Sequence, residues 1–226
     1  SGYQKMQVVN TFNSFNYHVQ QTEFGTFAEL VATGYSKSNS IGDPELPVMS
    51  RLIEIPAGAV PEVHVVSYTI REYKLSDFGI TDRLFPLQPP MPKNGTLPER
   101  ISYNASTYQQ DRFFGEQLAR VEVSGYMRGV RLGNLVLSPV QYNPVTRVLR
   151  IYDDLVVDVK FNGADIAATR EMKAKYDSPY FRNVYSRVLN MQPFETDRDT
   201  MMKRPVKYVI VSPPMFHDAL QHFIHW

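Results

Sequence analysis

Residues 118–143 read LARVEVSGYMRGVRLGNLVLSPVQYN, and this stretch decides the fold class of the chain. Apolar and polar residues alternate over short runs, which is the pattern of strands with one buried face. Gly125, Gly129 and Gly133 fall inside these runs, so they do not form a nucleotide-binding glycine fingerprint. A turn signal at Asn143-Pro144 follows, and another strand pattern begins after it. The stretch therefore predicts consecutive strands that pair as hairpins.

Similar strand patterns recur from Met6 to Phe161, with turns between them. Their spacing of about ten residues is typical of a β-sandwich. We therefore expect a mainly β chain with an antiparallel β-sandwich over residues 24–161. In residues 62–70, EVHVVSYTI, the apolar positions do not keep one strict phase, which predicts a β-bulge there.

Composition narrows the classes of function. The chain has 226 residues, of which 43% are hydrophobic and 21% are charged, so it can bury a core. A formal net charge of +1 argues against a nucleic-acid partner. The sequence contains no cysteine, which excludes a disulfide, a thiolate metal site and a cysteine nucleophile within these residues. No apolar run reaches the roughly 20 residues that a membrane-spanning helix needs.

Residues 85–107, FPLQPPMPKNGTLPERISYNAST, differ from the strands around them. They contain five prolines and show little periodicity, which predicts a long exposed loop. Loops of this length in a β protein often carry function, so this segment is a candidate site.

After Phe161 the pattern changes from alternation to helical spacing. Ser178 can cap a helix and Pro179 suits the first turn, which predicts a helix over residues 179–190 packed beside the sandwich. Its apolar face would consist of Phe181, Val184, Tyr185 and Val188.

The last part of the chain predicts a linker and then the start of another domain. Residues 191–205 are polar and lack a period, so we expect a linker there. Residues 206–226, VKYVIVSPPMFHDALQHFIHW, predict a short strand at Val206–Val211 and a helix from Phe216 onward. This order is that of the first strand and helix of an α/β domain whose remainder lies outside these residues.

Candidate catalytic and metal-binding residues are few. The last predicted helix carries three histidines: His217, His222 and His225. Their spacing lacks the i, i+4 pair that a helical zinc site prefers. Asp153, Asp154 and Asp158 could bind calcium or act as acid and base, but Asp153-Asp154 are expected to form a turn between two strands. No nucleophile elbow, phosphate-binding loop or Rossmann fingerprint occurs. We therefore expect no catalytic residue, metal or cofactor in this chain.

The segment of residues 42–65, GDPELPVMSRLIEIPAGAVPEVHV, resembles the N-terminal propeptide of the gingipain family of cysteine peptidases. The matching residues are Gly42, Pro44, Leu46, Pro47, Ile55, Pro56, Gly58 and Ala59. The resemblance continues in order through YNASTY, GYMRGVRLGNLVLSPVQYNP, FNGAD and SPYF. It ends in residues 206–226, which are similar to the opening strand and helix of the family's catalytic domain.

This resemblance implies an inhibitory and folding-assisting prodomain rather than an enzyme. It implies a β-sandwich propeptide with a helical tail over residues 1–190, an activation region over 191–205 and the beginning of a caspase-like domain over 206–226. The catalytic His and Cys of the family lie further along the precursor. The implied partner is the precursor's own catalytic domain, in a bacterial protein that is secreted or associated with the outer membrane. A signal peptide would lie outside these residues, and a homodimer of the isolated chain stays open.

In the family, a basic side chain on an exposed loop occupies the recognition pocket of the protease. Arg112, in YQQDRFF, lies close to where that residue falls in the family. Lys93, in PMPKNG, belongs to the Pro-rich loop and precedes an Asn-Gly turn signal. Both residues are candidates, and the alternative for each is an ordinary solvated charge.

Activation of such a precursor requires a cleavable bond after the prodomain. The family cleaves after a basic residue near the position of Asn190-Met191, where this sequence has no Lys or Arg. The basic candidates are Arg198, Lys203 and Arg204 in the linker, with Arg187 just upstream. Either cleavage shifts along the linker, or the parent protease is not specific for basic residues, or another protease makes the cut. A second interpretation of the whole chain is a cell-surface β-sandwich module that binds carbohydrate or protein.

Overall fold

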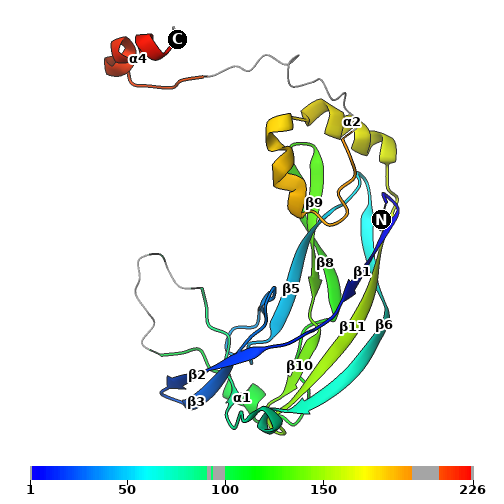
Figure 1. Cartoon of the computed structure of the whole chain (residues 1–226), viewed down its shortest axis with the longest axis vertical. Helices are drawn as coiled ribbons and strands as arrows, with labels where there is room; N and C mark the ends of the chain where they lie inside the picture. The colour runs from blue at the N-terminus through cyan, green and yellow to red at the C-terminus, as the bar shows by residue number, and fades with distance from the viewer. Residues whose placement is uncertain (1, 91–92, 94–99, 195–208, 225–226) are drawn as a thin grey trace. The chain divides into compact units, whose positions relative to one another are not determined.

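The computed structural model describes residues 2–90, 93, 100–194 and 209–224. Two compact units are distinguished, residues 1–194 and 195–226, and each is described by itself. All strands of the described residues lie in the first unit, where they form antiparallel sheets apart from one short parallel pair (Figure 1). The expectation of a mainly β, antiparallel fold is confirmed. The first unit extends to Phe194, past the boundary expected at residue 190.

The long strand β11 (Val148–Asn162) organises the first sheet. Strand β6 (Val60–Lys74) pairs with it along one edge, and β10 (Val140–Asn143) and β1 (Lys5–Asn10) pair with successive parts of the other edge. The turn predicted after Asn143 joins β10 to β11, and the Asn143 carboxamide oxygen accepts two backbone N–H groups within it. Inward-facing residues of β11 alternate with outward-facing ones, as the sequence pattern predicts.

The pairing of β6 with β11 is irregular near its middle. Ser67 pairs with Val156 and Val65 pairs with Val157, with register shifts on both sides of Val156. Residues 62–70 therefore contain the bulge that their broken alternation predicts.

The turn expected at Asp153-Asp154 is wrong, because β11 runs through both residues without a break. Asp154 has a positive φ of 48° and bulges out of the strand. The Asp153 carboxylate is buried and accepts hydrogen bonds from the backbone N–H groups of Phe12 (3.0 Å) and Asp154 (3.0 Å). A buried hydrogen bond to Phe12, far away in the chain, thus holds Asp153 within the strand where the local sequence suggests a turn.

The second sheet faces the first. Its strands in spatial order are β4 (Ser36–Lys37), β5 (Pro47–Glu54), β9 (Val130–Leu137) and β8 (Ala119–Met127). A hairpin turn at Arg128-Gly129 joins β8 to β9, with positive φ at both residues. A small third sheet contains β2 (Asn16–Thr22), β3 (Gly25–Val31) and β7 (Arg83–Leu84), of which β7 pairs with β3 in parallel.

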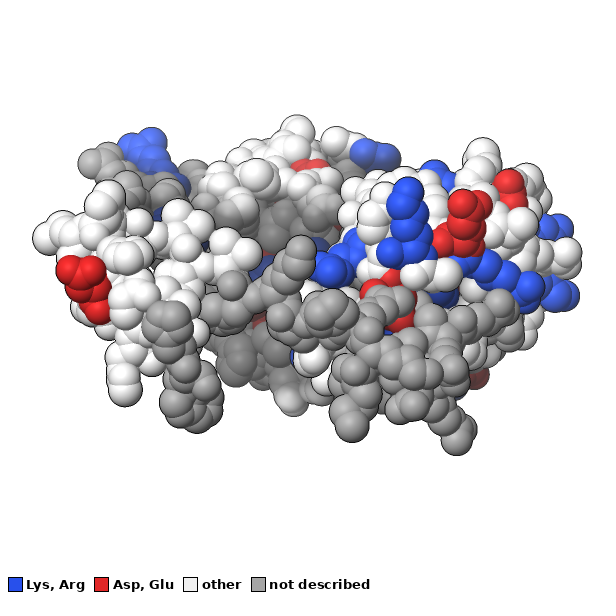
Figure 2. All heavy atoms as spheres, turned by 90° about the horizontal axis from the view of Figure 1, so that it is seen from above, with Lys and Arg blue, Asp and Glu red and all other residues white. Residues whose placement is uncertain are grey.

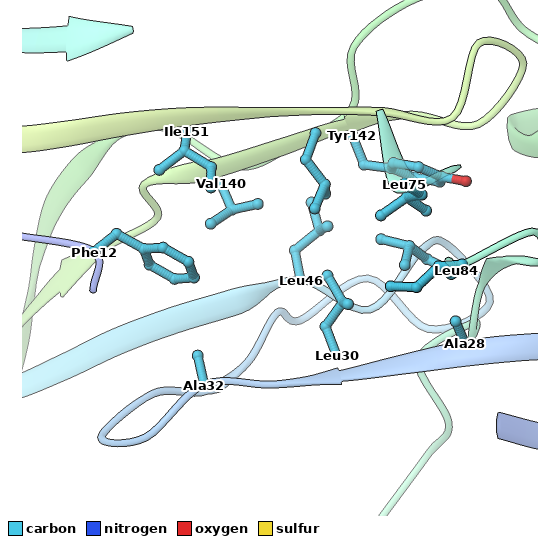
Figure 3. Close-up of a cluster of buried hydrophobic side chains, with 12 residues drawn as sticks. Phe12, Ala28, Leu30, Ala32, Leu46, Leu75, Leu84, Val140, Tyr142 and Ile151 are labelled. Atoms are coloured by element: carbon cyan, nitrogen blue, oxygen red, sulfur yellow. The ribbon is translucent and has the colours of Figure 1, made fainter. Parts of the chain in front are cut away.

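The described residues form three hydrophobic clusters, of which the two largest fill the interior of this unit. Figure 3 shows the first cluster, in which residues from the small sheet meet the beginning of β11. Its buried members include Ala28, Leu30, Leu75, Leu84, Tyr142, Leu149 and Ile151. The second cluster lies between β5, β9 and the later part of β11, and includes Ile53, Ile55, Leu135, Leu137, Leu155, Val157 and Val159. Strand β11 therefore contributes to both clusters.

A helical segment closes one end of the sandwich. Helix α2 (Ile166–Tyr176) begins after Asp165, whose carboxylate accepts the backbone N–H of Ala168 (2.8 Å). The next element, η2 (Pro179–Arg187), is a 3-10 helix, so the α-helix expected over 179–190 is wrong in type and length. In a 3-10 helix residues three apart align. Phe181 and Val184 accordingly share an exposed side of η2, whereas Tyr185 and Val188, the extended residue that follows η2, are buried.

The second unit contains a short 3-10 turn, η3 (Pro214–Phe216), and helix α4 (His217–Ile224). The helix agrees with the sequence pattern. Val209–Val211 do not form a strand, and residues 206–208 lie outside the described residues. A strand needs a hydrogen-bonded neighbour, and the described part of this unit offers no second strand. No helix among the described residues is long and apolar enough to cross a membrane.

Candidate functional site

The Pro-rich loop leaves the body through a closed neck. The Gln88 side chain donates to the carbonyl oxygen of Ser102 (3.0 Å) and accepts the backbone N–H of Ser102 (2.8 Å). These two hydrogen bonds join the outgoing and returning arms of the loop. Lys93 lies in a turn beyond this neck and is exposed, while residues 91–92 and 94–99 lie outside the described residues. The neck therefore fixes where the loop carrying Lys93 starts and ends.

Both arms of the loop are fastened to the small sheet and to residues 42–45. Phe85 donates its backbone N–H to Ala28 and accepts that of Glu45, both at 2.8 Å. Leu87 and Gly42 are likewise paired with this region through backbone hydrogen bonds. Aromatic rings cover the returning arm, including Tyr103 stacked on Phe24 with centroids 5.0 Å apart. The expected exposed loop over residues 85–107 is thus ordered at both ends, and helix α1 (Ala105–Tyr108) begins inside it.

The segment after α1 carries Arg112 and is pinned to β10. Phe114 and Tyr142 exchange two backbone hydrogen bonds, each of 2.8 Å. Asn143 donates from its side chain to the Asp111 carboxylate (2.7 Å). The Arg150 guanidinium lies over the Phe113 ring, 3.7 Å from its centroid. Arg112 therefore projects from a segment whose neighbours on both sides are held in place.

The Arg112 side chain itself is exposed and only loosely held. Its Nε donates to the Gln110 side chain (2.8 Å), and its guanidinium lies 4.2 Å from the centroid of the Phe114 ring. A cation–π contact of this exposed kind contributes about 0.5–1 kcal/mol. Freeing the guanidinium for another acceptor would therefore cost little.

Two buried tyrosines lie next to the segment that carries Arg112. Tyr108 donates from its hydroxyl to the carbonyl oxygen of Leu84 (2.7 Å), and both Tyr108 and Tyr142 are almost fully buried. Burial raises the pKa of Tyr142 to about 12 and raises that of Tyr108 further. Both phenols are neutral at physiological pH, which suits a structural support rather than an acid or base.

The described part of the structure records no contact between Lys93 and Arg112, so it does not bring the two candidates together. Charges elsewhere are mixed. Figure 2 shows Lys and Arg side chains interspersed with Asp and Glu over the end of the sandwich that carries α2, rather than a field of one sign. This mixture agrees with the net charge of +1, and the described residues on this face form no stripe for a polyanion.

Of the candidate cleavage residues, the structure describes Arg187 alone. It is exposed at the end of η2. Arg198, Lys203 and Arg204 lie outside the described residues. What the sequence reasoning missed is that Glu54 and Lys173, far apart in the chain, form a buried ion pair beneath the segment after Arg187. No local pattern signals it, since each residue looks like an ordinary charge in its own element.

The aspartates and histidines considered above have structural surroundings. Asp158 accepts a hydrogen bond from Gln7 (2.8 Å) and Asp154 accepts one from Thr11 (3.0 Å), both across the β1 edge. Within the described residues no group of three His, Cys, Asp or Glu side chains could hold a metal ion. His225 lies outside them.

Most of the sequence matches the model of a known protein family. A family model described as Propeptide_C25 matches residues 2–175. Lys-gingipain of Porphyromonas gingivalis strain ATCC 33277 is 35% identical over 218 residues, covering 96% of this chain. The chain spans only 12% of the length of that relative.

Two solved structures are similar. One, concerning the zymogenic latency of gingipain K from Porphyromonas gingivalis, is 35% identical with a TM-score of 0.66, over 72% of this chain and 90% of that one. The other, a complex of the pro- and mature domains of RgpB from the same organism, has a TM-score of 0.66 over 84% of this chain and 94% of that one. At 23% identity the second similarity shows the fold alone.

Proposed function

The chain belongs to the Propeptide_C25 family of gingipain propeptides, and we propose that it keeps a gingipain-like cysteine endopeptidase latent and assists its folding. The observation that carries this proposal is the family match over residues 2–175, together with a relative that is similar over 96% of the chain. The chain has no cysteine, so the nucleophile of such a peptidase would come from the remainder of a longer precursor. Residues 206–226 would begin its catalytic domain.

The partner in this proposal is the catalytic domain of the same precursor, in a secreted or surface-associated protein. Covalent tethering sets an effective concentration of roughly millimolar for a short linker, so a modest intrinsic affinity is enough for latency. Latency then does not require a large or strongly charged contact surface, in agreement with the mixed charges on the face that Figure 2 shows.

A basic side chain would supply the specificity by entering an acidic recognition pocket. Arg112 is the stronger candidate, because Phe114 and Asp111 hold its segment in place and little ordering would be lost on binding. A guanidinium can also bind a carboxylate through two parallel hydrogen bonds. Lys93 is the second candidate, supported by its exposure on a loop with a closed neck.

The test is inhibition in trans of the isolated catalytic domain by this chain. Losing the inserted cation leaves the acidic group of the pocket buried and unpaired, which costs about 2–5 kcal/mol, or roughly 30-fold or more in affinity. Arg112→Ala, Lys93→Ala and the double variant are compared with Lys175→Ala, an exposed basic residue on α2 that should have no effect.

If the double variant inhibits as well as the unchanged chain, the basic-residue mechanism is wrong. If the unchanged chain does not inhibit at all, the latency role is wrong and a cell-surface binding module becomes the better interpretation.

A further inference from the structure

The residues that follow η2, Val188–Phe194, run along the edge of β5, and we call them the strap. Leu189 donates its backbone N–H to the carbonyl oxygen of Leu52 (2.9 Å). The Asn190 side chain accepts the backbone N–H of Glu54 (2.7 Å) and donates to its carbonyl oxygen (2.9 Å). Here β5 has a strand partner, β9, on one side only. The strap therefore satisfies an otherwise open sheet edge.

A buried ion pair fastens the strap to the body. Glu54 and Lys173 are only 1% and 2% exposed, and Nζ of Lys173 lies 2.8 Å from Oε1 of Glu54. The other carboxylate oxygen of Glu54 accepts the backbone N–H of Gln192 (2.8 Å). Nζ of Lys173 also donates to the carbonyl oxygen of Gln192 (2.8 Å). Detaching the strap would thus remove partners from both buried charges, which is strongly unfavourable.

Apolar packing fixes the two ends of the strap. Val188 is buried in a cluster with Leu132 and Tyr185. Phe194, at the other end, packs against the Tyr185 ring with centroids 5.6 Å apart and lies 4.9 Å from Nζ of Lys173. The strap is therefore held along its whole length, from the residue after Arg187 to the last residue of the unit.

This geometry bears on Arg187, whose side chain is exposed and would suit a protease that cleaves after basic residues. The bond that follows it is not free. The backbone N–H of Val188 donates to the carbonyl oxygen of Tyr185 (3.0 Å), and the residues beyond are held by the strap contacts. A protease needs several residues on each side of the bond in an accessible, extended form, so cleavage here requires local opening.

We propose that the strap, fastened by Glu54 and Lys173, protects the Arg187–Val188 bond from proteases that cleave after basic residues. The biological meaning of this protection rests on the proposed latency, because only a propeptide has to be released at a defined bond. The protection itself is a property of this chain alone.

The experiment is limited proteolysis of the full chain by trypsin, with the rate at each bond followed by mass spectrometry. Cleavage after Arg187 should be on the order of 100-fold slower in the folded chain than in the same chain unfolded in urea. Asn190→Ala should speed cleavage after Arg187 about tenfold, and Glu54→Gln about 100-fold. Glu72→Gln is the matched control, since it breaks an exposed ion pair with Arg150 and should change nothing at Arg187.

Two results would overturn the proposal: cleavage of the folded, unchanged chain after Arg187 as fast as in the unfolded chain, or no acceleration in Asn190→Ala. If Glu54→Gln does not fold, as judged by near-ultraviolet circular dichroism, Asn190→Ala and Phe194→Ala decide the question, because they leave the ion pair intact. The assay contains no catalytic domain of the precursor, so its outcome is independent of the inhibition test.

Discussion

The turn at Gly129 allows a direct test of how α2 is placed on the sandwich. Gly129 has φ of 82°, and a Cβ built there would lie 3.0 Å from the carbonyl carbon of Met172 and 3.1 Å from Cδ2 of Tyr176. The contact with the Met172 carbonyl group involves helix backbone, which cannot move aside at low energetic cost. Gly79 has a similar φ of 74°, but a Cβ there meets nothing within 4 Å. The two glycines therefore form a matched pair that differs in the close approach alone.

Gly79→Ala should cost about 1–2 kcal/mol of unfolding free energy, the strain of a left-handed residue with a Cβ. Gly129→Ala carries the same strain and adds an overpacking cost of about 1–3 kcal/mol, so its total should be roughly 2–5 kcal/mol. Urea unfolding of the full chain, followed by far-ultraviolet circular dichroism, measures the change in unfolding free energy for both variants. Equal destabilisation by the two substitutions would refute the close packing of α2 on the β8–β9 turn.

Two further predictions concern the region around the candidate loops. Burial raises the pKa of Tyr142 to about 12 from an unfolded value of 10.0, so the folded state favours the neutral phenol. The free energy of unfolding should therefore fall by roughly 2–3 kcal/mol between pH 10 and about 12. Tyr142→Phe should reduce this loss in alkaline unfolding curves. Gln88→Ala removes both hydrogen bonds across the loop neck and should lower local stability by about 1–3 kcal/mol. Hydrogen exchange at the Ser102 N–H should become faster, and unchanged exchange would contradict the prediction. Gln117→Ala, which changes an exposed glutamine, is the control.

Much of the sheet structure could be predicted because the information is local. The alternation in residues 118–143 and in β11 reflects one buried face, and the turn at Asn143-Pro144 is encoded by the residues that form it. The bulge in residues 62–70 was also visible, since a bulge breaks the phase of the alternation where it occurs.

The errors arose where a distant partner overrides the local pattern. Asp153-Asp154 has the composition of a turn, but the backbone N–H of Phe12 binds the Asp153 carboxylate inside the sandwich. The helix after Ser178 ends at Arg187 because Leu189 pairs with the edge of β5 at Leu52. Neither partner can be recognised from sequence neighbours.

The loop that carries Lys93 could be predicted, whereas the contacts that hold both candidate segments could not. Prolines mark the loop that carries Lys93, because proline-rich segments without a period rarely form strands. The hydrogen bonds of Gln88 across the neck and the pinning of the Arg112 segment on Tyr142 could not be predicted, since they depend on which distant strands become neighbours.

The position of β11 has a consequence for the order in which the chain can fold. Lys5 near the beginning of the chain pairs with Lys160, and Val60 pairs with Asn162. Strands β1, β6 and β10 thus all pair with β11, which is synthesised after them. Contacts between residues so distant in sequence close slowly, because loop-closure entropy must be overcome before they form. During synthesis, β1, β6 and β10 therefore have no partner in the first sheet until β11 has emerged, and a chain ending before Val148 would leave all three as unpaired edges.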